Sequence, residues 1–408
     1  MRSFRIGSAF GIPLKLDLTF LLVLPLFAYL IGAQVGFYVE QLNGLFGTSL
    51  DAAALTGGSV PFVIGSVAAV GLFVGVVLHE LGHSLVAMRY GVDIDSITLW
   101  LFGGVARLTE MPEDWKQELY IAIAGPVVSV VLGVACYAAF LAAPGLLAVG
   151  GGGGTAGVAT TFVLGYLALV NVLLAGFNLL PGFPMDGGRV LRALLARTRS
   201  YARATQIAAE VGKGFAILLG IVGLLGGLNI FLVGIAFFIY IGAASEAQQT
   251  ITRAAFEGVL VRDVMTPHER VDTVDAAASV GQLLDRMFRE RHTGYPVVRD
   301  GAVVGLVTLQ DAEAVREVER DAYRVEEVMT AELVTVGPDD DAMEALTRMQ
   351  QEGVGRLVVM DGEEFVGLLT RSDLMTALDI IRSSGQLDER IRRRPSANTG
   401  ASRPEESP

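Results

Sequence analysis

Long stretches without lysine or arginine constrain the fold of this chain more than any other feature. Neither residue type occurs in 16–88, 117–188 or 214–252, and each stretch is rich in apolar residues. A helix needs about 20 consecutive apolar residues to cross a bilayer. The chain contains six runs that approach or exceed this length, and we predict spans at 17–38, 60–88, 118–142, 158–179, 207–224 and 226–244.

The basic residues of this region gather between the predicted spans. They form three clusters, one with Arg2, Arg5 and Lys15, one with Arg89, Arg107 and Lys116, and one running from Arg189 to Lys213. Short loops rich in Lys and Arg stay on the cytoplasmic side of a membrane. Six crossings place all three clusters in the cytosol. We therefore expect a multi-pass protein of the cell membrane with both termini cytosolic.

Charge divides the chain into two unlike parts. Residues 1–252 carry 12 basic and 13 acidic side chains, and the remaining residues carry 19 and 30, which gives the net charge of −12. An apolar membrane domain, 1–252, is thus followed by an acidic soluble part. An acidic surface argues against binding to nucleic acid, which requires a basic one. Cys136 is the only cysteine, so an internal disulfide or a cysteine-based zinc site is excluded.

A metal-binding pattern ends the second predicted span. In His79-Glu80-Leu81-Gly82-His83 the two histidines are four residues apart, so on a helix they share one face and can bind one zinc ion. Glu80 then stands beside the metal as a candidate general base. Such polar groups at the end of an apolar span are costly and mark functional sites. A zinc site of this type requires a third protein ligand.

The end of the fourth predicted span supplies a candidate for that ligand. Residues 178–189, Asn-Leu-Leu-Pro-Gly-Phe-Pro-Met-Asp-Gly-Gly-Arg, contain two prolines and three glycines that interrupt the helix. Irregular backbone at membrane depth is tolerated where it lines a site or a wet cavity. Asp186 is the candidate third ligand, although it also fits the N-cap of a helix that starts near Gly187. Asn178 can donate a hydrogen bond to a developing oxyanion, or it can simply end the helix.

Residues 92–110 alternate between polar and apolar side chains and are rich in β-formers. This pattern predicts a re-entrant β-hairpin around a turn at Gly103 and Gly104. An open strand edge can pair with an extended peptide. Gly103 and Gly104 are therefore candidate substrate-edge residues, and the alternative is a short interfacial loop.

Together these motifs resemble the site-2 protease family of intramembrane zinc metalloproteases, peptidase family M50. The resemblance rests on His79-Glu80-x-x-His83, on the 178–189 segment, on Phe102-Gly103-Gly104 and on Ala124-Gly125-Pro126. It implies that His79, His83 and Asp186 bind one Zn²⁺, that Glu80 is the general base and that Asn178 holds the substrate carbonyl or its oxyanion. It also implies a single-span membrane protein as substrate, cleaved within the bilayer in regulated intramembrane proteolysis.

The acidic part contains an internal repeat, 259–317 and 324–381. Val-Met-Thr at 264–266 recurs at 328–330, and the run Gly-Leu-Val-Thr-Leu-Gln-Asp at 305–311 recurs in altered form at 367–373. Each copy predicts a strand, a helix, two strands and a second helix. The repeat resembles a tandem pair of CBS domains, α/β modules that bind adenine nucleotides such as ATP or AMP and often form homodimers. The resemblance implies nucleotide binding by Thr308, Asp311, Thr370 and Asp373.

The sequence thus predicts a multi-domain zinc metalloendopeptidase. A polytopic helical membrane domain precedes a linker at 253–258, two cytosolic CBS domains and a disordered tail at 382–408, and the CBS pair modulates activity by binding an adenine nucleotide. Two other interpretations remain open at this point. CBS pairs also occur on transporters, so a nucleotide-gated metal-ion transporter is one alternative, and an inactive membrane scaffold is the other.

Overall fold

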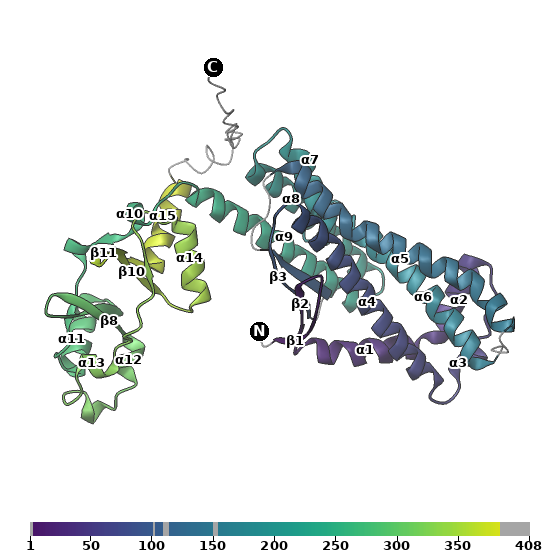
Figure 1. Ribbon diagram of the computed structural model, residues 1–408, viewed down its shortest axis with the longest axis horizontal. Coiled ribbons are helices and arrows are strands. Elements are labelled where there is room, and N and C mark those ends of the chain that lie inside the picture. Colours follow the sequence, from purple (N-terminus) through teal and green to yellow (C-terminus); the bar gives the residue numbers. More distant parts are fainter. Residues whose placement is uncertain (1–2, 101–102, 109–113, 150–153, 384–408) are drawn as a thin grey trace, which may run out of the picture. The chain divides into compact units, whose positions relative to one another are not determined.

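The computed structural model describes residues 3–100, 103–108, 114–149 and 154–383 (Figure 1). The described residues separate into two compact units that meet at Gln248 and Gln249, and each unit is described by itself. Residues 150–153 and, of the tail predicted at 382–408, residues 384–408 lie outside the described residues.

Five helices of the first unit are long and apolar enough to cross a membrane. They are α4 (Val60–Arg89), α5 (Trp115–Val149), α6 (Thr155–Asn178), α8 (Tyr201–Leu225) and α9 (Ile230–Phe256). A sixth candidate is the pair α1 (Phe20–Ala33) and α2 (Val35–Phe46), which is bent by 66°. The predicted polytopic helical fold is therefore confirmed.

The first predicted span differs from the structure at both ends. Residues up to Asp17 are strand, and Gln34 has a non-helical backbone that separates α1 from α2. The helix α1 crosses α4 closely at glycines, since a Cβ on Gly32 would lie 2.7 Å from the carbonyl oxygen of Pro61. Small residues at a crossing let two membrane helices approach this closely.

A four-stranded sheet joins two distant parts of the first unit. Its strands are β1 (Ser3–Ala9), β2 (Ile12–Asp17), β3 (Ile94–Trp100) and β4 (Gly103–Leu108), in that order across the sheet. The predicted hairpin is β3 and β4, with Trp100 opposite Gly103. The two glycines thus begin β4 instead of forming the turn. The sequence pattern did not predict β1 and β2, of which β2 pairs with β3 in parallel.

The centre of the first unit is formed by α4, α5 and α6, which lie side by side (Figure 1). Near the N-terminal end of α6, the one-turn helix α3 (Ala53–Thr56) and α2 pack on this layer. At its other end, α6 is followed by the Pro-Gly segment and then by α7 (Asp186–Ala196), which packs between α5 and α8.

The second unit contains two copies of one α/β pattern, as predicted. The first copy comprises β6 (Val274–Asp275), α11 (Val280–Glu290), β7 (Gly294–Arg299), β8 (Ala302–Thr308) and α12 (Leu309–Glu313). The second comprises β9 (Thr335–Val336), α14 (Ala342–Gln351), β10 (Arg356–Asp361), β11 (Glu364–Thr370) and α15 (Arg371–Ser383). One-turn helices precede them, α10 (Val261–Val264) and α13 (Val325–Val328).

The two copies exchange their leading segments. The short strand β5 (Thr266–Pro267) starts the first copy but pairs with β11 of the second. In the same way, Thr330 at the start of the second copy bridges to Leu306 on β8 of the first. The segment expected to be a linker, 253–258, continues α9 as far as Phe256, whose side chain is buried in the core of the second copy.

Candidate metal centre

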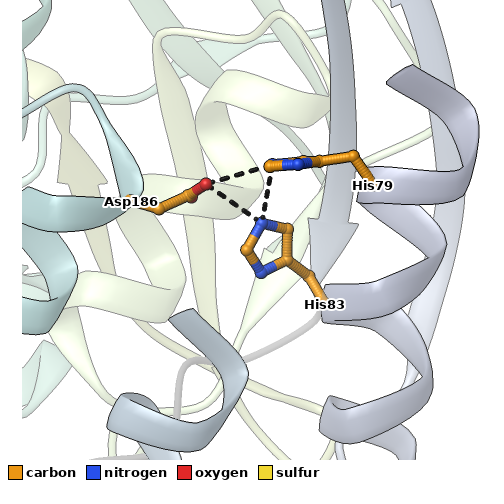
Figure 2. A group of neighbouring side chains, drawn as sticks. All are labelled: His79, His83 and Asp186. Atoms are coloured by element: carbon orange, nitrogen blue, oxygen red, sulfur yellow. Dashed lines mark hydrogen bonds and ion pairs between the residues drawn. The ribbon is translucent and has the colours of Figure 1, made fainter. Parts of the chain in front are cut away.

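Three side chains converge from two separate parts of the membrane unit (Figure 2). His79 and His83 extend from one face of α4, and Asp186 reaches them from the first residue of α7. The Nε2 atoms of the two histidines are 3.2 Å apart, and Asp186 Oδ2 lies 3.1 Å from one and 3.2 Å from the other. The structure therefore brings together the three predicted ligands, which are 107 and 103 residues apart in sequence.

The triangle formed by these atoms has the size of one face of a zinc coordination tetrahedron. Bonds of about 2.0–2.1 Å at tetrahedral angles place neighbouring ligand atoms about 3.3 Å apart. The observed sides of 3.1–3.2 Å are close to this value. Two imidazole nitrogens and one carboxylate oxygen are also a ligand set found in catalytic zinc sites, where the fourth position is left to water. The residues thus fit a zinc ion.

Both histidines are oriented by hydrogen bonds at their other ring nitrogen. His83 Nδ1 lies 2.7 Å from the carbonyl oxygen of Ile121. A carbonyl can only accept, so Nδ1 carries the proton and Nε2 of the neutral ring is left with a lone pair toward the triangle. His79 Nδ1 lies 2.8 Å from Ser129 Oγ, which is fully buried. Sequence reasoning missed these partners on α5, although a lone serine in an apolar helix is a signal for Ser129.

A glycine on α5 makes room for one of the imidazoles. A Cβ at Gly125 would lie 2.6 Å from His83 Cε1 and 2.7 Å from Cδ2. Ordinary contacts of this type are 3.4–4 Å long. Gly125 belongs to the Ala-Gly-Pro motif, and its missing side chain is a requirement of the site.

Two further glycines fix the helix that bears Asp186. A Cβ on Gly187 would lie 2.5 Å from the carbonyl carbon of Leu179, and one on Gly188 would lie 2.5 Å from the backbone nitrogen of Phe183. The first turn of α7 is therefore pressed against the Pro-Gly segment that precedes it. This close approach explains why the interrupted segment ends in two consecutive glycines.

The candidate base Glu80 lies against strand β4. The backbone N–H of Ala106 donates to Glu80 Oε2 at 3.3 Å. A Cβ on Gly104 would lie 2.6 Å from Glu80 Cγ, so a larger residue there would collide with the glutamate. Since β4 is an outer strand of its sheet, the edge that faces Glu80 has no strand partner among the described residues. The strand edge and the base are thus direct neighbours.

Asn178 is the last residue of α6, and its side-chain amide donates to the carbonyl oxygen of Leu174 at 3.0 Å. Within the described residues, Asn178 forms no hydrogen bond with His79, His83 or Asp186. Its role toward the substrate stays a prediction. The observed hydrogen bond is the one expected of a residue that ends a helix.

A pocket of about 650 Å³ lies between the two copies of the second unit. Thr308 and Asp311 line it from the first copy, and Arg356 lines it from the second, where its guanidinium donates to Thr293 Oγ1 at 2.6 Å. Burial lowers the pKa of the Arg356 guanidinium, but an arginine stays charged at neutral pH. Thr370 and Asp373 are not among the residues that line this pocket.

The Thr-x-x-Asp motifs also have a structural role in both copies, where they cap a helix. Thr308 caps α12, and its hydroxyl and backbone N–H both donate to Asp311 Oδ2, at 2.7 and 2.8 Å. Thr370 and Asp373 repeat this arrangement at the start of α15. One carboxylate oxygen of each aspartate, Oδ2, thus holds the start of the following helix.

Comparisons with known proteins identify both units. A model of peptidase family M50 matches residues 67–219, and a model of the CBS domain matches 261–314 and 325–380. The chain is similar to zinc metalloprotease MJ0392 of Methanocaldococcus jannaschii, with 34% identity over 95% of this chain and 99% of that protein. It is similar to the putative zinc metalloprotease Rip3 of Mycobacterium tuberculosis, with 36% identity over 79% and 83% of the two chains.

Among solved structures, the site-2 protease of M. jannaschii matches with 34% identity and a TM-score of 0.39, covering 60% of this chain and 95% of that one. The identity to MJ0392 extends over nearly the whole of both sequences. The chain therefore belongs to peptidase family M50, as a zinc metalloprotease with two CBS domains and several helices that are long and apolar enough to cross a membrane.

Proposed function

We propose that this enzyme cleaves peptide bonds within the membrane-spanning segment of single-span substrate proteins. The observation that carries the proposal is the triangle of His79, His83 and Asp186, with Glu80 on the adjacent position of the same membrane helix. A zinc ion held there would polarise the scissile carbonyl and lower the pKa of a bound water. Glu80 would accept a proton from the attacking water and pass it to the leaving amine.

Strand β4 is the proposed docking edge for the substrate. A helical peptide keeps its carbonyls in internal hydrogen bonds, so it has to be extended before it can be cut. An extended peptide at the β4 edge would gain strand hydrogen bonds, and the Ala106 N–H, which now contacts Glu80, is one available donor. Gly103 and Gly104 keep this edge free of side chains. Asn178 is the proposed hydrogen-bond donor to the substrate carbonyl or its oxyanion.

A proline at Ala106 tests the docking edge. Ala106→Pro removes the N–H, while proline is tolerated on outer strands of a sheet. We expect the KM for a model single-span substrate to rise about tenfold, which corresponds to the loss of one hydrogen bond to the bound peptide. The change in kcat should be smaller. Ala106→Ser, which keeps the N–H, is the matched control. Equal KM values for the two variants would show that the substrate does not use this donor.

The proposed chemistry is tested most directly at Glu80. Glu80→Gln keeps the size of the side chain but cannot accept the proton, so cleavage of a single-span substrate by the zinc-loaded enzyme in detergent should fall by at least about a hundredfold. Glu40→Gln, an exposed position on α2, is the matched control and should cleave normally. Cleavage by the Glu80 variant at the wild-type rate would refute the proposal.

We further propose that the CBS pair lies in the cytosol, associates as a homodimer and binds an adenine nucleotide that modulates cleavage. The pocket beside Thr308 supports this, because the carboxylate of Asp311 suits ribose hydroxyls and Arg356 suits a phosphate. Calorimetry of the full-length enzyme with ATP and AMP should give saturable binding that Asp311→Asn weakens and Asp300→Asn, in an exposed turn, does not. No saturable binding of either nucleotide would refute this part.

A further inference from the structure

A buried arginine lies close to the aspartate ligand but has no part in the proposed chemistry. Arg192 is six residues after Asp186 on α7, and it is 1% exposed. Its Nε donates to Glu118 Oε1 of α5 at 2.6 Å, and its Nη1 donates to Glu246 Oε1 of α9 at 2.8 Å. One guanidinium thus links three helices of the membrane unit.

Two aromatic rings complete the surroundings of this guanidinium. Its central carbon lies 4.8 Å from the ring centre of Phe183, which precedes Asp186, and 4.6 Å from that of Tyr201 at the start of α8. Both distances are in the range of a cation–π contact. A buried ion pair contributes little net stability, because the charges lose their hydration. Its geometric consequence is larger, since Arg192 holds α7 and the preceding segment in one arrangement.

The helix α9 contacts this segment along one face. Ile239 packs with Met185, a Cβ on Gly242 would lie 2.9 Å from Pro184 Cγ, and Glu246 pairs with Arg192. These α9 residues recur at helical spacing. They touch the chain on both sides of Asp186, at 184–185 and at 192. The position of the third ligand therefore depends on where α9 lies.

The same helix ends in the core of the CBS pair. Ala255 and Phe256 are fully buried there, together with residues of the second copy such as Leu346 and Leu374. Only nine residues, or about 13 Å of helix, separate Glu246 from Ala255. The residues between them all belong to α9.

We propose that Arg192 and Glu246 are positioning residues for Asp186, and that α9 transmits the nucleotide state of the CBS pair to the metal site. The first half concerns the metal site alone. The second half rests on the proposed nucleotide binding, so the two halves are measured separately.

Zinc affinity tests the positioning role without any substrate. Glu246→Ala removes one partner of Arg192, and the zinc dissociation constant of the full-length protein, measured by competition with a chelator, should rise about 10- to 100-fold, as for other residues that orient metal ligands. Glu210→Ala, at an exposed position of α8, is the control and should bind zinc normally. If Glu246→Ala does not fold, Glu246→Gln replaces it, with an expected rise of about threefold or more. Wild-type zinc affinity in the folded variant overturns the positioning role.

Zinc release tests the transmission. Saturating ATP should change the rate of zinc release from the wild-type enzyme about fivefold or more, the lower range of coupling between two sites. In Glu246→Ala that change should disappear while calorimetry still detects ATP binding. A release rate that ATP leaves unchanged in the wild type, or changes equally in both proteins, overturns transmission through α9. If ATP does not bind the wild type at all, both the proposed nucleotide function and the transmission through α9 are refuted. The zinc affinities still decide the positioning role.

Discussion

Replacing Gly125 with alanine should remove the metal without any change to a ligand. The added Cβ would lie 2.6 Å from His83 Cε1, whereas ordinary contacts begin near 3.4 Å. The imidazole would have to move by at least about 0.8 Å, because its Nε2 would lie even closer to the added Cβ than Cε1 does. Metal–ligand distances in well-formed sites agree with ideal values to about 0.2 Å. Movement toward α4 is blocked by the helix that carries His83, and its hydrogen bond to Ile121 would be strained. We expect zinc affinity to fall by at least about a hundredfold, or about 2.7 kcal/mol.

The assay is the zinc content of the purified variant after gel filtration, followed by chelator competition and cleavage of a single-span substrate. Gly176→Ala is the matched control, because it makes the same change within α6 where a Cβ meets no atom within 4 Å. It should keep its zinc and its activity. A Gly125→Ala enzyme with a full complement of zinc and the wild-type rate would refute the steric argument and, with it, the observed packing of α5 against His83.

Three more results are expected. Ser129→Ala removes the hydrogen-bond partner of His79 Nδ1, so zinc should bind about 10- to 100-fold more weakly. An unchanged zinc affinity would mean that the serine does not orient the imidazole ring. The proposed nucleotide pocket is lined by the carboxylates of Asp311, Glu313 and Glu332 and, among its described lining residues, by the single cation of Arg356. Calorimetry should therefore find ATP bound about tenfold more tightly with magnesium than with EDTA, and equal affinities would count against ATP in this pocket. Asp341→Ala removes the acceptor for two backbone N–H groups of α14. Amide hydrogen exchange in the first turn of α14 should therefore become about fivefold faster, equivalent to about 1 kcal/mol. In Asp341→Asn these amides should exchange almost as in the wild type.

Much of the fold follows from local patterns in the sequence. Uninterrupted apolar length predicts most membrane helices, and the repeated Gly-x-x-Thr-x-x-Asp run predicts both CBS copies with their order of strands and helices. The three candidate ligands could also be named from the sequence. The spacing of His79 and His83 places them on one face of a helix, and the prolines before Asp186 interrupt the regular helix there. These signals are short-range, and each is complete within about thirty residues.

The unpredicted features depend on contacts between distant segments. The pairing of β2 with β3 joins residues 14–16 to 97–99, and nothing local in Leu14-Lys15-Leu16 indicates that partner. Arg192 looks like one member of a basic cytosolic cluster, and only the packing of α5 and α9 around it reveals a buried ion pair. The bend at Gln34 likewise has no proline or glycine at the break itself.

The pairing of β2 with β3 also restricts how the chain crosses the membrane. The two strands run in parallel, with residues 14–16 opposite 97–99, so the ends of β2 and β3 lie side by side. Two strand ends on one side of a bilayer require an even number of crossings in the chain between them. With α4 as one crossing, this parity favours the bent pair α1 and α2 as the other, that is, a broken span and not a loop that returns to its own side.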